Sequence, residues 1–352
     1  MSRNVNKILE VIKNNLTEGT NIPALEKNKR WNIDEATFLI LVGNIVIIDS
    51  YVVDNEHRAI VLSVTDDGNS YTYLVTYGYD ESLSYSNLEE VGFDFAHFLF
   101  VVEELNIPCN RNVATDAFLS EYLFTGQDLS IEQVKEYLPK CYGSVCSYLI
   151  KEPLPASCSE RQQFLIKIVF EHELQTATLS VLPFDNDTIT AYNQVINNSS
   201  KHIPIESVFL SLLERKYKFC FLDLFRCIER LFRISMTHEF EKTLQSTINR
   251  TKIAEFVKQY AGNGHQSNQI QYLFKLLPSN VSDIITNAFN GDINVGNIFY
   301  DTRNDIVHYK TAASPHESYS QIQWNALIRF SLLAIDILYT EFDNYLNDIP
   351  EI

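Results

Sequence analysis

The spacing of apolar residues divides the chain into two regions with different patterns. From about residue 205 onward, apolar residues recur every three or four positions, which is the spacing of amphipathic helices. The segments with this pattern are 221–234 (FLDLFRCIERLFRI), 251–261 (TKIAEFVKQYA), 269–277 (QIQYLFKLL), 281–289 (VSDIITNAF), 297–310 (NIFYDTRNDIVHYK) and 323–346. Pro204 suits the residue before a helix that starts at Ile205. The pattern predicts an all-α bundle over residues 205–352.

Residues 1–204 mix strand-like and helix-like stretches. Two segments with β-type composition, 58–65 (RAIVLSVT) and 71–78 (YTYLVTYG), flank a turn-rich DDGNS loop and predict a β-hairpin. FLIKIVF at 164–170 and ATLSVLPF at 177–184 predict a second hairpin, with HELQT as solvated turn residues. The pattern predicts an α+β region over residues 1–204, and it leaves the strand order open.

The charge of the chain is negative and unevenly distributed. The formal net charge is −17 over 352 residues. Residues 1–204 hold 14 Lys and Arg against 28 Asp and Glu, whereas residues 205–352 hold 14 against 17. Such acidity argues against a protein that coats nucleic acid over its whole surface. It leaves the helical region able to admit an anionic substrate locally.

The cysteines and the longest apolar run point to a cytoplasmic protein. None of the six cysteines forms a CxxC pair or a zinc-type spacing with histidine, so we expect reduced thiols, no metal site and no cofactor. The apolar run at 38–48 (FLILVGNIVII) is too short to span a bilayer. The first residues lack the unbroken apolar core of a signal peptide. We therefore predict no association with a membrane.

The segment 297–310 holds the strongest candidate for chemistry, the pattern Arg303-Asn304-x-x-x-His308. On a helix, Asn304 and His308 share a face, and Arg303 lies about 100° round from Asn304. A histidine transfers protons near neutral pH, and an arginine stabilises the negative charge that grows on a phosphate during cleavage. Asn304 can fix the imidazole tautomer or bind the same oxygens. These groups suffice for metal-independent cleavage of RNA by its own 2′-hydroxyl.

A row of charged residues along the predicted helix 221–234 is the second candidate. Its members fall within roughly 120° of one another on a helix that is otherwise apolar. They are Asp223, Arg226, Glu229, Arg230 and Arg233. The row is either a solvated edge joined by ion pairs three and four residues apart, or the lining of a polar cavity where arginines bind phosphate. With Lys310, its arginines and Glu229 are the predicted supporting and RNA-binding residues.

A second Arg-x4-His match, Arg233 to His238, has Ile234 rather than a polar residue after the arginine. We therefore interpret it as a coincidence of spacing. The other Arg-Asn pair, Arg111-Asn112, is followed by Asp116 where the histidine would fall.

The segment IFYDTRNDIVHYK resembles the signature of HEPN domains, α-helical bundles whose ribonuclease members carry Arg, a polar residue and then His on a late helix. FLDLFRCIERLF is similar to the first helix of many defence-associated HEPN proteins, and a long apolar helix at 323–346 closes such a bundle. The resemblance covers about residues 205–352. It implies that His308 is the general acid or base, Arg303 the phosphate ligand and Asn304 a supporting residue. Arg226 and Glu229, on the first helix, would support these three residues.

The family resemblance also implies partners and a biological role. Active HEPN ribonucleases usually form homodimers in which two motifs build one composite cleft, and tRNA is a frequent substrate. An α+β region before such a domain resembles the Apea-like branch, which is implicated in abortive anti-phage defence. The acidic region 1–204 would then sense an unknown trigger. The alternative is a catalytically silent bundle that binds nucleotide or RNA, or only dimerises, with Arg303 and Asp305 in structural ion pairs.

Overall fold

The computed structural model describes residues 45–53, 57–66, 68–79, 87–92, 95–104, 129–142, 145–177, 180–245, 265–290, 294–308 and 315–348, with residues 12, 31–32, 106–107 and 109. The chain forms two compact units, Met1–Leu165 and Ile166–Ile352. The division falls inside a helix and earlier than the predicted boundary at residue 204, because the second part of that helix and the helix after it belong to the helical unit.

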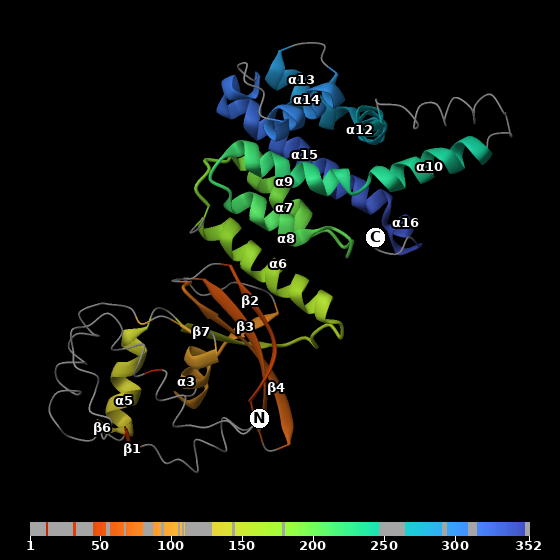
Figure 1. Ribbon diagram of the computed structural model, residues 1–352. Helices are drawn as coiled ribbons and strands as arrows, with labels where there is room; N and C mark the ends of the chain where they lie inside the picture. Colours follow the sequence, from red (N-terminus) through yellow and green to blue (C-terminus); the bar gives the residue numbers. More distant parts are fainter. Residues whose placement is uncertain are drawn as a thin grey trace. The chain divides into compact units, whose positions relative to one another are not determined.

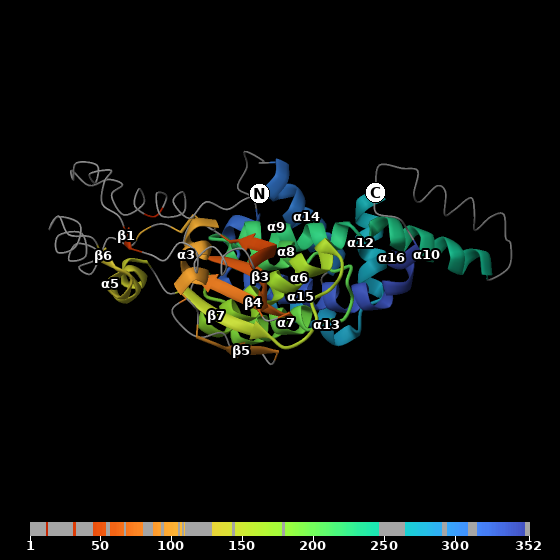
Figure 2. The same cartoon turned by 90° about the horizontal axis from the view of Figure 1, so that it is seen from below.

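The N-terminal unit is built on an antiparallel sheet (Figures 1 and 2). Its strands, in the order β2-β3-β4-β7-β5, are β2 (Ile45–Val52), β3 (Arg58–Asp66), β4 (Asn69–Tyr77), β7 (Val145–Ile150) and β5 (Leu88–Glu90). A short parallel pair joins β1 (Trp31–Asn32) to β6 (Leu129–Ser130). The helical elements are α3 (Phe95–Glu104), α5 (Ile131–Tyr137) and η2 (Leu138–Cys141).

The first predicted hairpin is confirmed. β3 pairs with β4 in an unbroken register that ends at Asp66 opposite Asn69. Gly68 in this turn has a φ of 81°, which glycine adopts without the steric cost that a side chain would add.

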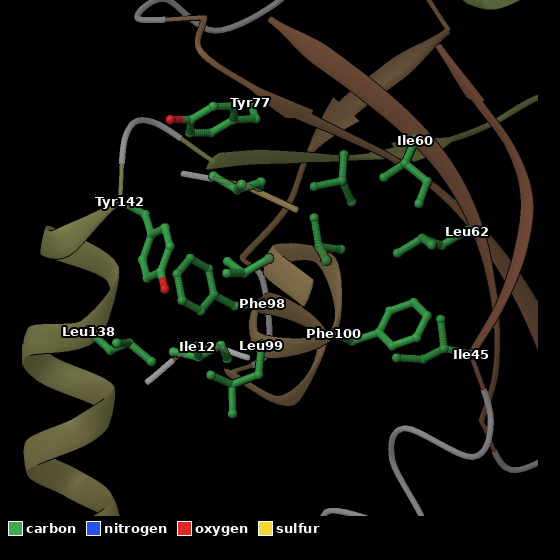
Figure 3. Close-up of a cluster of buried hydrophobic side chains, with 14 of the residues drawn as sticks. Ile12, Ile45, Ile60, Leu62, Tyr77, Phe98, Leu99, Phe100, Leu138 and Tyr142 are labelled. Atoms are coloured by element: carbon green, nitrogen blue, oxygen red, sulfur yellow. The ribbon is translucent and has the colours of Figure 1, made fainter. Parts of the chain in front are cut away.

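The core of this unit lies between the sheet and α3. Alternate residues of β3 and β4 point to α3, which presents aromatic and aliphatic side chains to them. Figure 3 shows this cluster, which includes Ile45, Ile60, Leu62, Tyr77, Phe98, Leu99, Phe100, Leu138 and Tyr142.

The second predicted hairpin is wrong, because residues 158–176 form one helix, α6 (Cys158–Thr176). Ser157 caps its start: its hydroxyl accepts a hydrogen bond from the Glu160 amide at 3.2 Å and donates one to the Glu160 carboxylate at 2.7 Å. The apolar run 165–170 is buried almost entirely, and burial on a broad face outweighs the β propensity of its residues. His172 and Glu173, expected in a solvated turn, are buried in α6.

The C-terminal unit is helical throughout its described part. After α6 come α7 (Asn186–Ile196), α8 (Ile205–Leu213), α9 (Tyr217–Glu229), α10 (Phe232–Gln245), α12 (His265–Lys275), α13 (Ser279–Phe289), α14 (Val295–His308), η3 (Pro315–Ser318), α15 (Gln321–Glu341) and α16 (Asp343–Asp348). Pro204 precedes α8 as predicted. The predicted helix at 251–261 lies outside the described residues.

Helix α15 is the core of this unit and contacts α7, α9 and α13. Ser320 and Gln323 form a capping box at its start. By length and composition α15 could cross a membrane, but 67% of its most apolar window is buried inside the unit. Its apolar character is therefore explained by its place in a helical core, and no other described helix meets the same criteria.

The helix predicted over 221–234 is interrupted. α9 ends at Glu229, Arg230 and Leu231 form a turn, and α10 begins at Phe232. The Leu231 amide bonds to the Ile228 carbonyl three residues back, which tightens the chain at this point. Arg233 is consequently on α10 rather than on the helix of Arg226, and the predicted row of charges is divided.

Candidate active site

Aromatic packing fixes the position of the motif helix α14. Phe299 is completely buried, and its ring centroid lies 5.3 Å from that of Phe221, 5.0 Å from that of Phe274 and 4.8 Å from that of Phe330. These three rings belong to α9, α12 and α15, so one residue joins α14 to three neighbours. Gly296, one turn earlier, has no room for a side chain, because an added Cβ would lie 2.8 Å from Gln271 Cγ.

Arg303 projects from α14 toward α9. Its guanidinium forms an ion pair with the Glu229 carboxylate at 3.3 Å and donates a hydrogen bond to Asn304 Oδ1 at 3.1 Å. The guanidinium carbon also lies 5.9 Å from the centroid of the Phe225 ring. The Arg303 side chain is 19% exposed and that of Glu229 is 31% exposed. The pair is therefore close enough to solvent for a phosphate to compete for the guanidinium.

His308 is the last residue of α14 and is exposed. Within the described part of the chain, no hydrogen bond or ion pair engages its imidazole. His308 is five positions after Arg303, which places their side chains about 140° apart around the helix. Asn304, four residues before His308, is on the same face as the histidine. One copy of α14 thus presents its arginine and its histidine in different directions.

The buried side of α14 serves the fold. Thr302 is buried, and its hydroxyl lies 3.2 Å from the hydroxyl of Tyr319. Burial raises the pKa of Tyr319, and the charges of Asp305 and Asp301 add to this effect. Asp305 is buried, about 200° round the helix from Arg303. Arg303 therefore forms its ion pair with Glu229 of α9 and not with Asp305 of its own helix.

Two of the predicted supporting arginines lie together on α9. Arg226 and Arg230 are exposed, and with Ser207, Cys227 and Glu229 they line a hollow of about 290 Å³, which we name the α8–α9 hollow. Arg226 donates a hydrogen bond to Asp223 at 2.9 Å. Burial raises the pKa of Asp223, and Arg226 acts in the opposite direction. Glu229 belongs both to this hollow and to the ion pair with Arg303.

The remaining predicted residues do not join this group. The side chain of Arg233 and all of Lys310 lie outside the described residues. His238, from the second Arg-x4-His match, is on α10, and its Nδ1 lies 2.9 Å from the Tyr272 hydroxyl. In the described ranges, no three His, Cys, Asp or Glu side chains lie close enough together to hold a metal ion.

The structure adds two residues that the sequence did not indicate. Phe225 lies beneath the guanidinium of Arg303, and Ser207 brings a hydroxyl from α8 to the hollow. Both contacts join residues far apart in the sequence, and no local pattern marks them. Comparisons of the chain with family models, with curated proteins and with solved structures each found no match.

Proposed function

We propose that this chain is a metal-independent endoribonuclease of the HEPN type. The observation that carries the proposal is the geometry of α14, where Arg303 contacts solvent beside α9 and His308 ends the helix in an exposed position. The bundle around α14 and the long apolar helix α15 agree with what the resemblance implies for such a domain. The local balance of Arg226, Arg230 and Arg303 against Asp223 and Glu229 is positive in a chain of net charge −17.

The proposed reaction is transesterification followed by release of the 5′ product. His308 accepts the proton of a ribose 2′-hydroxyl, and the 2′ oxygen attacks the adjacent phosphorus. The bond from phosphorus to the 5′ oxygen breaks, that oxygen receives a proton from a protonated His308 imidazole, and a 2′,3′-cyclic phosphate remains. Arg303 exchanges Glu229 for the phosphate and stabilises its growing negative charge. Asn304, which already bonds Arg303, keeps the guanidinium directed at this position.

A homodimer would complete the site. Because Arg303 and His308 diverge on one copy of α14, a phosphate held by Arg303 meets an imidazole more readily when a second copy faces the first. Two copies of His308 can then divide the two proton transfers between them. This arrangement is the one that the family resemblance implies.

We place this activity in the cytoplasm, as a toxic effector of abortive anti-phage defence with tRNA among its substrates. In this proposal the acidic N-terminal unit responds to a trigger that is still to be identified. Its own core and sheet support a separate regulatory role, since the unit is compact by itself.

A silent helical bundle is the second candidate, and one observation favours it. Arg303 is already satisfied by Glu229, by Asn304 and by the face of Phe225. An arginine with three partners can serve the fold alone. In that case the chain binds RNA or nucleotide, or dimerises, without cleaving anything.

Cleavage of total cellular RNA in excess EDTA separates the two candidates. The purified wild type is compared with Arg303→Ala and His308→Ala, each verified as folded. We expect cutting by the wild type alone, with 2′,3′-cyclic phosphate ends. Intact RNA in every reaction would support the silent bundle, and equal cutting by all three proteins would place the activity elsewhere.

A further inference from the structure

The α8–α9 hollow adjoins the candidate active site through one shared residue. α8 and α9 lie side by side, as Figures 1 and 2 both show. Arg226 and Arg230 are four residues apart near the end of α9 and therefore project from the same side of it. Ser207 faces them from α8. Glu229, on the wall of the hollow, bonds Arg303 at 3.3 Å, so the hollow and the motif arginine are next to one another.

The charges of the hollow are not balanced. Arg226 is paired with Asp223 and Arg303 with Glu229. Arg230 has no ion pair within the described ranges. It is the C-cap residue of α9, where a positive charge is favoured by the helix dipole. Its charge acts on its surroundings: burial raises the pKa of the Cys227 thiol to about 12, and Arg230 opposes that shift. An exposed guanidinium beside a second guanidinium is a suitable ligand for an anion.

We propose that the α8–α9 hollow binds a phosphate of the RNA strand that flanks the phosphate held by Arg303. Arg226 and Arg230 hold the flanking phosphate, and Ser207 donates a hydrogen bond from the facing helix. Glu229 separates the two phosphate positions and fixes their spacing along the strand. The volume of about 290 Å³ is close to the lower limit of the usual range for small-ligand sites. This inference rests on the proposed function.

The test is RNA binding without cleavage. Full-length His308→Ala protein is titrated with a fluorescein-labelled single-stranded RNA in EDTA, over a series of salt concentrations. The test variant adds Arg226→Gln and Arg230→Gln. We expect about tenfold weaker binding at low salt, and a slope of log K against log[salt] that falls by roughly 0.7 for each phosphate that the protein no longer neutralises. A variant with Arg226→Lys and Arg230→Lys keeps the charge but loses the bidentate geometry, and we expect an intermediate affinity.

The matched control lies between the same two helices. Arg215 and Lys216 line a different hollow of about 450 Å³ at the α8–α9 connection. Arg215→Gln with Lys216→Gln removes the same charge, and we expect less than half of the effect on affinity and on slope. Equal losses in both double variants, or unchanged binding in the Arg226 and Arg230 variant, would overturn the proposal. Thermal unfolding of each variant verifies that the bundle is intact.

Inorganic phosphate distinguishes the two sources of the anion. At constant ionic strength, phosphate raises the melting temperature of any variant that binds it in the hollow. A rise that depends on Arg226 and Arg230, with RNA affinity unchanged by their removal, would show a free-phosphate site and overturn the proposal. Cleavage is scored separately with wild type. RNA binding that depends on the hollow, without any cutting, would leave this subsite standing while the proposed function fails.

Discussion

The chain holds two Arg-x4-His stretches, and their surroundings differ. Arg303 to His308 occupies α14, and Arg233 to His238 occupies α10. His308 is exposed at a helix end, whereas His238 is half-buried, with its ring centroid 5.4 Å from that of Phe342 and 5.5 Å from that of Tyr345. The spacing is therefore compatible with two outcomes. Packing leaves one imidazole open to a substrate and uses the other as part of an aromatic cluster.

The largest expected difference between the two stretches is catalytic. His308→Ala is expected to lower the rate of RNA cleavage by about 10² to 10⁴-fold, the usual contribution of a general acid or base. Its effect on the free energy of unfolding should stay within about 0.5 kcal/mol because the side chain is exposed. His238→Ala is the matched control and should cleave at nearly the wild-type rate. Initial rates in EDTA measure both, and the reverse ranking would identify α10 as the catalytic helix.

The arginines extend the same comparison. Arg303→Lys keeps the positive charge but removes the fork of donors that binds phosphate, so we expect about 10²-fold slower cleavage. The rate constant at saturating RNA should account for most of this loss, because the phosphate is held most tightly in the transition state. Arg233→Lys, at the equivalent position of the other stretch, should change the rate by less than about threefold. A wild-type rate for Arg303→Lys would mean that positive charge alone matters, and a similar loss in both variants would mean that the Arg303 guanidinium has no special role.

Local patterns predicted the elements of the site but not the contacts between them. The helix that carries Arg303 and His308 and the β3–β4 hairpin follow from short-range spacing and turn composition. The break at Arg230 has no glycine or proline to mark it. The hairpin predicted at 164–184 is wrong because the buried face of α6 is rich in β-branched residues, which also favour strands. The pairing of Arg303 with Glu229 joins residues from different helices, and only tertiary packing determines it.

For the free energy of unfolding, the ranking should reverse: His238→Ala should have a larger effect than His308→Ala. His238→Ala removes a hydrogen bond to Tyr272 and edge-on contacts with two aromatic rings. We expect a loss of about 1–2 kcal/mol in the free energy of unfolding. Urea unfolding followed by circular dichroism measures it, with His308→Ala as the control. A loss below about 0.5 kcal/mol would mean that the aromatic cluster holds α10 without its histidine.

The smallest effect is expected from Tyr272→Phe, which keeps the ring beside His238 and removes only the hydroxyl. At pH 8 we expect a loss of about 1 kcal/mol, the value of one hydrogen bond, and little change from Tyr71→Phe at an exposed strand position.

The pH dependence tests the cause of this effect. Burial, with the charges of Glu239 and Tyr345, raises the pKa of Tyr272 from its ordinary value of 10.0 to about 12. A folded-state pKa above the unfolded value means that the folded protein retains this proton longer. The resulting stability is present below pH 10 and is lost as the pH rises through about 12. Phenylalanine has no such proton, so the advantage of the wild type should shrink between pH 8 and pH 11. A gap of constant size would mean that Tyr272 ionises alike in the folded and unfolded chains, and that the environment of His238 is more open to water than that of a packed core.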